Sequence, residues 1–199
     1  EAAPRMIEAI DAAREAGDSV GGLIEVVATG VPIGLGSHIQ WDRKLDARLA
    51  RAMMSINAVK GVEIGTGFAN TRRPGREVQD VIVPDPSDPR RFRQTSNHAG
   101  GIEGGMSNGQ PIITNVAIKP IATMKKPLPS VDINTGEVVE AAYNRSDICQ
   151  VARACPVGEA MMALVLVEAM LEKFGGDSLG EMSRNYTGYI ESHQEFGRG

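Results

Sequence analysis

The sequence predicts an α+β protein. Segments with helical periodicity and short β-branched apolar segments alternate irregularly along the 199 residues, without the regular strand–helix–strand repeat of a doubly wound sheet. The composition, with 42% hydrophobic and 23% charged residues, is that of an ordinary globular protein. Because aromatic residues make up only 4% of the chain, aliphatic side chains and methionine must fill the core. We find no internal repeat and no dividing linker, so residues 1–199 are expected to belong to one domain.

The N-terminal third predicts two helices and two strands. Apolar residues share one face of an amphipathic helix that Gly17 ends, and Leu45, Leu49, Met53 and Ile56 recur at helical spacing in a second one. Two short β-branched runs indicate strands, and a run rich in glycine must be a loop between them. The expected elements are a helix at 4–16, a strand at 22–28, a loop at 30–36, a helix at 42–56 and a strand at 59–64.

The middle of the chain predicts a long surface excursion, a glycine-rich segment and a strand. Residues 69–95 are polar, with four prolines and several arginines around the short apolar strand 81–83. An excursion of that length is typical of a functional lid or a flexible segment. Residues 96–109 contain five glycines, which excludes a stable helix or an ordinary strand. Residues 111–118 alternate as in a strand.

The C-terminal part predicts a long apolar helix. A basic loop leads to residues 137–142, a further candidate strand. Pro156 suits the start of a helix that runs to Phe174 and ends at Gly175 and Gly176. Because this helix is apolar on nearly every side, we expect it to be buried on all faces. The polar tail beyond it is expected to be a short helix or partly disordered.

Charge and hydropathy argue against two classes of partner. The net charge of −4 gives no support to binding of nucleic acid or of an anionic membrane. The most apolar stretch, residues 161–167, falls short of the roughly 18–20 residues that span a bilayer, so we interpret it as part of a core helix.

The start of the sequence bears on whether the chain is part of a longer one. The chain begins at Glu1, close to a predicted helix, without the leader typical of a signal or transit peptide. It is therefore either a piece cut from a longer chain or a protein with a trimmed terminus.

Cys149 and Cys155 lack the spacing of a zinc pair, and no metal site is expected. We expect two free thiols in a reducing compartment.

Two segments could bind an anion or a cofactor through backbone groups or lysine. The glycines of 96–109 would let N–H groups approach a phosphate or a flat ring, although Glu103 would oppose a phosphate and no dinucleotide fingerprint is present. A tight turn system packed against a helix explains these glycines equally well. Lys119 lies at the end of a predicted strand, where it could meet an anion. A solvated basic loop with Lys125 and Lys126 is the simpler interpretation of its surroundings.

A third candidate is the pair Arg145 and Asp147, between a predicted strand and the last long helix. Arginine offers a bidentate fork for phosphate or carboxylate, and the aspartate could act as a base or orient the arginine. An internal salt bridge is an equally common explanation. The three histidines are isolated, as structural histidines usually are: His38, His98 and His193.

Taken together, these segments resemble the chorismate synthase family. The resemblance extends from about residue 4 to about residue 190, in family order. Two long stretches carry most of it, MMSINAVKGVEIG at 53–65 and SNHAGGIEGGMSNG at 96–109. The shorter stretches are 17–22, 30–36, 45–47, 67–68, 119–120, 145–147 and 159–161.

The resemblance implies a fold and an activity. Family members are β-α-β sandwiches, with helices between antiparallel sheets, and assemble as homotetramers. They remove phosphate and a proton from 5-enolpyruvylshikimate 3-phosphate in an anti-1,4 elimination that gives chorismate, on the shikimate pathway to the aromatic amino acids. This carbon-oxygen lyase reaction requires reduced FMN. The resemblance further implies a cytoplasmic flavoprotein associated with NADP, and no nucleic-acid or membrane partner.

The resemblance also assigns residues. Asp147 matches an aspartate implicated in proton transfer at the flavin N5. The positions expected to contact FMN are Asn57, Ala58, Gly104, Lys119, Pro120, Ile121, Ala122, Thr123 and Arg145. The family commonly has small hydroxyl residues where this chain has Ile121 and Ala122, so side-chain bonds from these two positions are in doubt.

The resemblance places this chain in the C-terminal part of the family sequence. The two catalytic histidines and most substrate-binding arginines lie in the N-terminal half of the family, which this sequence does not contain, and His98 does not replace them. We therefore expect the chain alone to be inactive. The alternatives are a non-catalytic flavin- or nucleotide-binding module and, less in keeping with the motif order, an interaction domain.

Overall fold

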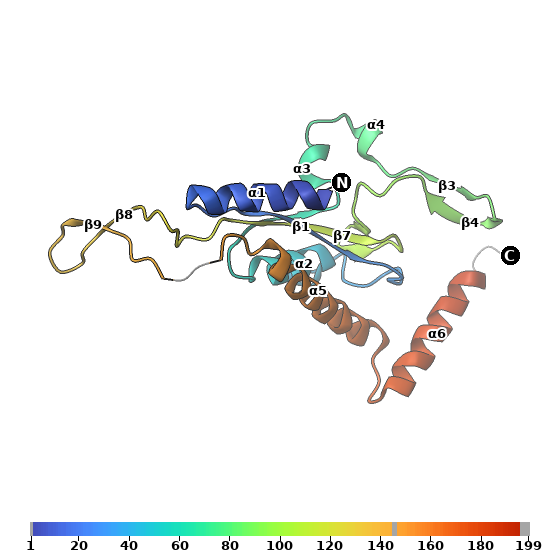
Figure 1. Cartoon of the computed structure of the whole chain (residues 1–199). Coiled ribbons are helices and arrows are strands. Elements are labelled where there is room, and N and C mark those ends of the chain that lie inside the picture. The colour runs from blue at the N-terminus through green and yellow to red at the C-terminus, as the bar shows by residue number, and fades with distance from the viewer. Residues whose placement is uncertain (1, 145–146, 196–199) are drawn as a thin grey trace.

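A three-stranded antiparallel sheet lies at the centre of the molecule, in the order β1-β7-β2 (Figure 1). The structure, a computed structural model, describes residues 2–144 and 147–195, without the side chains of residues 88–91 and 193–195. The three strands are β1 (Gly22–Ala28), β2 (Val59–Ile64) and β7 (Ile112–Ile118). The strands expected at 22–28, 59–64 and 111–118 are therefore confirmed, as is the α+β class.

One face of this sheet carries the core. Side chains alternate along β7, so Thr114 and Val116 are buried while the residues between them are half-buried. Two helices cover this face: α2 (Leu45–Met54) lies against β2, and α5 (Val151–Phe174) against β1. The helical spacing predicted for α2 is confirmed, because its buried residues are Leu45, Leu49 and Met53.

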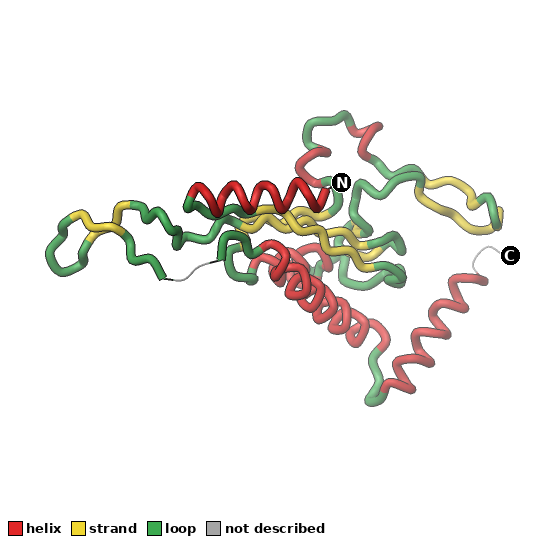
Figure 2. Tube along the Cα trace, in the orientation of Figure 1, coloured by secondary structure: helices red, strands yellow, loops and turns green. Residues whose placement is uncertain are grey.

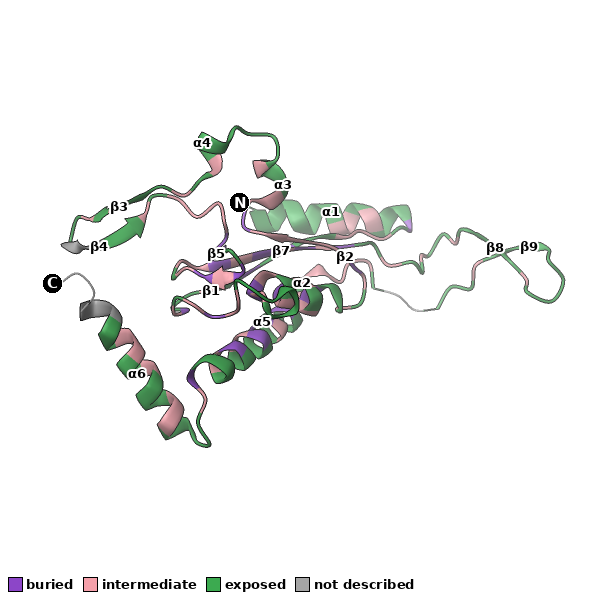
Figure 3. Cartoon of the chain, turned by 180° about the vertical axis from the view of Figure 1, so that it is seen from behind, coloured by how far each residue is buried: buried purple, intermediate pink, exposed green. Residues whose placement is uncertain are grey.

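The other face of the sheet is thinly covered. Helix α1 (Ala2–Ala16) runs along it (Figure 3) but contains no buried residue. Met6 and Ile7, on the predicted apolar face of α1, are 63% and 59% exposed, and Leu23 of β1 is 71% exposed. The amphipathic helix was predicted correctly, yet its apolar face meets no core in this chain.

Helix α5 differs from the prediction in its start and its burial. It begins at Val151, so Pro156 lies inside it, one turn after its start. It buries one side, with Met162 and Val165 in the core, whereas Leu164 is 62% and Val167 55% exposed. The expectation of a helix buried on all faces was wrong, because an apolar composition does not show how much of a partner surface the chain contains.

Helix α5 is also long and apolar enough to cross a membrane, by length and composition alone. The expectation that no stretch approaches that length was therefore wrong. The core helix of a globular protein passes the same test, and α5 packs on β1 and α2.

The remaining elements surround this body. The excursion 69–95 holds two short helices and a hairpin rather than one strand. The strand expected at 137–142 is shorter, Val138–Glu140, and forms half of a second hairpin. The C-terminal tail is a helix of 17 residues. The second hairpin sits on an extension that leaves the body beyond the Ile118 end of β7 (Figure 2). These elements are a 3-10 turn η1 (Trp41–Arg43), α3 (Gly67–Asn70), α4 (Gly75–Val78), β3 (Ile82–Asp85), β4 (Asp88–Gln94), β5 (Ile102–Glu103), β6 (Met106–Ser107), β8 (Pro129–Val131), β9 (Val138–Glu140) and α6 (Leu179–Glu195).

Candidate functional site

The predicted site residues fall at two opposite ends of β7. The strand has seven residues and is about 20 Å long. We call the end at Ile118 the Lys119 end and the end at Ile112 the Gly104 end. Strand β7 leads directly into Lys119 at the first, whereas the glycine-rich segment 96–109 enters the strand at the second.

At the Lys119 end, a tight turn joins α2 to the sheet. The turn needs Ala58 in the left-handed region, at φ 69°, which costs a non-glycine residue roughly 1–2 kcal/mol. The Ala58 carbonyl accepts a hydrogen bond from the Lys119 backbone N–H at 2.9 Å, which stabilises the turn. Asn57 and Lys119 therefore lie next to each other, and both are exposed.

The segment before β1 joins them. Gly21 allows the closest approach, because a Cβ there would lie 2.2 Å from the carbonyl oxygen of Ile118. The Ser19 hydroxyl donates to the Ile121 carbonyl at 2.6 Å, which orders the turn after Pro120. Consequently a hydrogen bond from the Ser19 side chain to the backbone of Ile121 holds this turn, and no side-chain hydroxyl at position 121 is needed.

Asp147 reaches the same end through the chain that precedes α5. The Val20 N–H donates to the carbonyl of Ile148, the residue after Asp147, at 2.9 Å. The Asp147 carboxylate forms an ion pair with Arg153 in the first turn of α5, and both side chains are substantially exposed. Of the two explanations left open for Asp147, an internal salt bridge is therefore present, with Arg153 as its partner.

An open hollow of about 430 Å³ lies beside this group. Its walls come from the end of α2 and the start of α5, with Asn57 on one side and Arg153 on the other. The apolar part of its lining comes from Ile56, Ala154, Val157 and Met161, and Ser55 and Gln150 add polar groups. A largely apolar hollow with amides and a guanidinium in its lining suits a flat ring that carries polar edges.

The Gly104 end is built differently. Gly104 and Gly105, at φ +60° and +85°, form the turn of the hairpin β5–β6, a tight reversal that requires positive φ. A Cβ on Gly105 would meet the Ser37 carbonyl oxygen at 2.7 Å, whereas nothing lies within 4 Å of one on Gly104. Close packing thus explains Gly105, while Gly104 is open to a ligand.

Asp80 anchors the glycine-rich segment. Its carboxylate accepts hydrogen bonds from the Ser96 hydroxyl at 2.6 Å and from the backbone N–H groups of His98 and Ala99 at 2.8 and 2.9 Å. Burial by itself raises the pKa of Asp80, but the bonds from Ser96, Ala99 and His98, with the charge of His98, lower it overall. The Asp80 carboxylate is thus kept ionised, and it holds the glycine-rich segment in place although Asp80 is not part of that segment. The sequence reading did not single out Asp80.

His98 serves this packing rather than a ligand. Its carbonyl accepts from the Thr66 backbone at 3.0 Å, and its ring Nδ1 lies 3.4 Å from the Thr66 hydroxyl. Glu103 accepts from Gln94 and Asn108 at 2.9 and 2.7 Å. The tight turn system foreseen as the alternative for residues 96–109 is therefore present.

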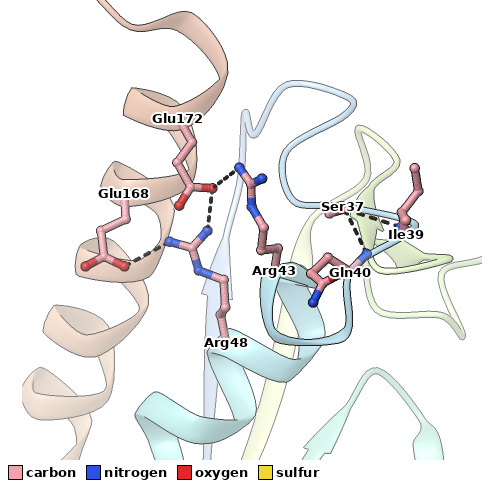
Figure 4. A network of polar contacts seen from close by, with 7 residues as sticks. All are labelled: Ser37, Ile39, Gln40, Arg43, Arg48, Glu168 and Glu172. Carbon is pink, nitrogen blue, oxygen red and sulfur yellow. Dashed lines mark hydrogen bonds and ion pairs between the residues drawn. The ribbon is translucent and has the colours of Figure 1, made fainter.

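The two helices on the core face are joined by an ion-pair network (Figure 4). Arg48 of α2 donates to Glu168 and Glu172 of α5, both at 2.9 Å, and its side chain is only 13% exposed. Burial lowers the pKa of Arg48, but its hydrogen bonds and charge interactions with the two glutamates raise it overall. Arg43 adds a looser contact of 3.7 Å to Glu172. The sequence reading missed this network, although the two glutamates are spaced i, i+4 on α5.

The structure thus brings together one part of the predicted set. Asn57, Ala58, the turn from Lys119 and Asp147 gather at the Lys119 end, while Gly104 lies at the other end of β7. Arg145 lies outside the described residues, as does the side chain of His193. Within the described part of the chain, no group of three or more histidine, cysteine or acidic side chains could hold a metal, and Cys149 and Cys155 are free thiols.

Comparison with known proteins settles the family. A family model described as Chorismate synthase matches residues 1–171. The chain belongs to the chorismate synthase family. It is 58% identical over 201 residues to a chorismate synthase of Geobacter sulfurreducens, and 54% identical over 194 residues to one of Saccharopolyspora erythraea. Each alignment covers 98% of this chain.

The fold agrees with the sequence match. A solved crystal structure of chorismate synthase superposes with a TM-score of 0.80 at 42% identity, covering 97% of this chain and 49% of that one. The alignments cover 51% and 48% of the two relatives. The chain therefore spans about half the length of the chorismate synthases that it matches.

Proposed function

We propose that this chain is the C-terminal portion of a chorismate synthase. The intact protein would act as a carbon-oxygen lyase that eliminates phosphate and a proton from 5-enolpyruvylshikimate 3-phosphate to give chorismate. The match of the chorismate synthase family model to residues 1–171 carries this proposal. Cytoplasmic location, a homotetrameric assembly and an association with NADP belong to the same proposal.

We further propose reduced FMN as the cofactor. The Lys119 end fits part of such a molecule, because an ammonium, an amide and an apolar hollow adjoin there. When bound, reduced FMN would supply the transient electron that assists departure of the phosphate. The residues that would hold FMN are Asn57, Ala58, Arg145 and the turn of Lys119, Pro120, Ile121, Ala122 and Thr123. Gly104 would contribute from the other end of β7, where the space around it is open to a ligand.

The residues of this chain would bind, orient and move a proton. The Lys119 ammonium would attract an anionic group, and the Asn57 amide would orient polar ring edges. Asp147 would hold or transfer a proton, with Arg153 fixing its carboxylate. Because the elimination needs further acid-base and phosphate-binding groups in defined positions, the chain alone should not catalyse it.

The alternative is a non-catalytic flavin- or nucleotide-binding module, and two measurements distinguish it. The first is an anaerobic assay of the 199-residue chain with photoreduced FMN, following chorismate absorbance and phosphate release. We expect no turnover from the chain alone, and turnover from an intact protein that carries this segment. Turnover by the chain at a rate within about tenfold of an intact family member would refute our account of the missing groups.

The second measurement is FMN titration of that intact protein. Lys119→Ala should weaken FMN binding at least about tenfold, equivalent to about 1.4 kcal/mol, whereas the control Lys125→Ala should leave it unchanged. Equal titrations for the two variants would contradict the cofactor assignment at the Lys119 end. An intact protein that binds FMN without lyase activity would instead support the binding module.

A further inference from the structure

The 17–22 segment, with the sequence GDSVGG, connects α1 to β1. The end of α1 fixes its first residues. The N–H of Gly17 donates to the Arg14 carbonyl at 3.1 Å, and the next N–H, of Asp18, donates to the Ala13 carbonyl at 2.9 Å. Gly17 is buried and has φ 75°, the left-handed conformation that ends a helix in this way. The segment therefore starts from a defined backbone position.

The first half of the segment is bonded to the loop 119–126, which leaves β7 at the Lys119 end. The Ser19 hydroxyl donates to the Ile121 carbonyl at 2.6 Å. The Lys126 N–H donates to the Gly17 carbonyl at 3.0 Å. Two hydrogen bonds between parts of the chain that are distant in sequence thus hold this loop near its start and at its end.

The second half of the segment adjoins both this loop and the chain that carries Asp147. Gly21 lies so close to the loop that a Cβ there would be 2.9 Å from the Pro120 nitrogen. The Val20 N–H donates to the carbonyl of Ile148, next to Asp147, at 2.9 Å. Val20 directly follows the residue that bonds the loop, so one short piece of backbone contacts both parts of the candidate site at the Lys119 end.

Strand pairing does not explain the bond from Ser19. Gly22 pairs with Ile118 at the end of the seven paired positions between β1 and β7. Ser19 and Ile121 stand three residues beyond that pair on either side, and Pro120, which has no N–H, cannot extend the ladder between them. The Ser19 hydroxyl therefore holds the chain where the backbone ladder has ended.

We propose that the 17–22 segment sets the separation between the two parts of the cofactor site, with Ser19 as the positioning residue. The inference rests on the proposed function, since it takes Lys119 and Asp147 to act on the same bound FMN. Both residues lie on irregular chain rather than on a helix or strand, so neither position is fixed by secondary structure. A misplacement of about 1 Å can slow a reaction about 100-fold, so groups that act on one molecule need such support.

The test compares Ser19→Ala with Ser192→Ala in the intact protein that carries this chain. Ser192 is the matched control, because its hydroxyl also donates to a backbone carbonyl, that of Tyr189 at 2.8 Å, but on α6. Ser19→Ala should weaken FMN binding about fivefold, the effect of one lost hydrogen bond, and should lower kcat at saturating FMN by a similar factor. Ser192→Ala should change neither quantity. Ser19→Thr keeps the hydroxyl and should stay within about twofold of the unmodified protein.

Hydrogen exchange without FMN measures the positioning itself. In Ser19→Ala, the amides of Val20 and Lys126 should exchange at least about fivefold faster, because their acceptors lie across the loosened contact. Amides in the middle of β7 should keep their rates, since that strand is paired on both sides. A purely stabilising role of Ser19 would lower Tm, but it would leave the FMN affinity and kcat of the folded protein unchanged.

The outcomes separate this inference from the proposed function. In a protein that binds FMN, equal exchange at Val20 and Lys126 in Ser19→Ala and Ser192→Ala would overturn the inference alone. Faster exchange with unchanged FMN affinity and kcat would overturn it as well, and so would a Ser19→Thr variant as impaired as Ser19→Ala. An unmodified intact protein that binds no FMN would refute the proposed function, and the inference with it.

Discussion

Replacing Arg48 with methionine should lower the free energy of unfolding by about 1–2 kcal/mol. Two charge-assisted hydrogen bonds of 2.9 Å are lost, from a side chain that is 13% exposed. Their acceptors, Glu168 and Glu172, are 70% and 43% exposed and can be hydrated again, so each bond counts for about 0.5–1 kcal/mol rather than the larger value of a buried pair. Methionine keeps most of the apolar stem that α2 packs against α5.

Scanning calorimetry at neutral pH measures the effect. A loss of that size should lower Tm by about 2–8 °C in a chain of this length. Arg43→Met is the matched control, because its contact to Glu172 is 3.7 Å long and its side chain is 60% exposed, so it should cost at most about 0.5 kcal/mol. Added salt should narrow the difference between the two variants. Equal losses for both, or a difference insensitive to salt, would show that the network does not hold the helices together.

Three further changes test the core, the turns and the Asp80 anchor. Val165→Asp should lower the free energy of unfolding by at least about 3 kcal/mol, because the side chain is buried. Leu164→Asp, next to it but exposed, should lower that free energy by less than about 1 kcal/mol. Equal midpoints of urea unfolding for the two variants would refute the placement of α5. Gly36→Ala should lower the free energy of unfolding by about 2 kcal/mol or more, since the new Cβ would lie 2.5 Å from the Gly105 carbonyl oxygen. Gly30→Ala, whose Cβ would have nothing within 4 Å, should lower it by only about 1 kcal/mol through backbone strain. Coincident denaturant unfolding curves for the two variants would contradict the close contact at Gly36. Asp80→Asn should destabilise the protein above pH 3.8, the ordinary pKa of the aspartate. The difference in stability between the variant and the unmodified protein should fade as the pH drops through the lowered folded-state pKa of Asp80. A difference that persists in acid would show that the charge of Asp80 does not anchor the glycine-rich segment.

The local patterns predicted the body of the fold well, because each reflects a face that the chain itself covers. Leu45, Leu49 and Met53 recur every four residues and are all buried. The alternation along β7 follows in the same way from a strand with one covered face. Where the covering surface is absent, pattern and burial diverge: Leu164 is as apolar as any core residue and is 62% exposed.

The missed elements had weaker signals that could be recognised. The run from Asp132 to Gly136 contains an Asx turn and a glycine at φ +72°, a hairpin signal that was interpreted as a basic loop. Helix α6 has a polar sequence, yet Tyr186 and Tyr189 pack their rings on Phe174, at centroid distances of 5.4 and 5.5 Å. Such a helix depends on a partner distant in sequence, which periodicity alone does not show.

The candidate site was only partly predictable for a similar reason. The family resemblance assigned both Lys119 and Gly104 to FMN, and in this chain the length of β7 lies between them. Conversely, Ala58 and Lys119 are distant in sequence and become neighbours through one backbone hydrogen bond. The pairing of Asp147 with Arg153 depends on where α5 begins.

The strand order has a consequence for how the protein forms in the cell. Strands β1 and β2 both pair with β7, which is synthesised last of the three. At a translation rate of about 5–20 residues per second, β1 waits several seconds for its partner, with Ile24 and Val26 still uncovered. Sheets closed by such distant pairings fold slowly, so the nascent chain passes through a period in which chaperones would bind it.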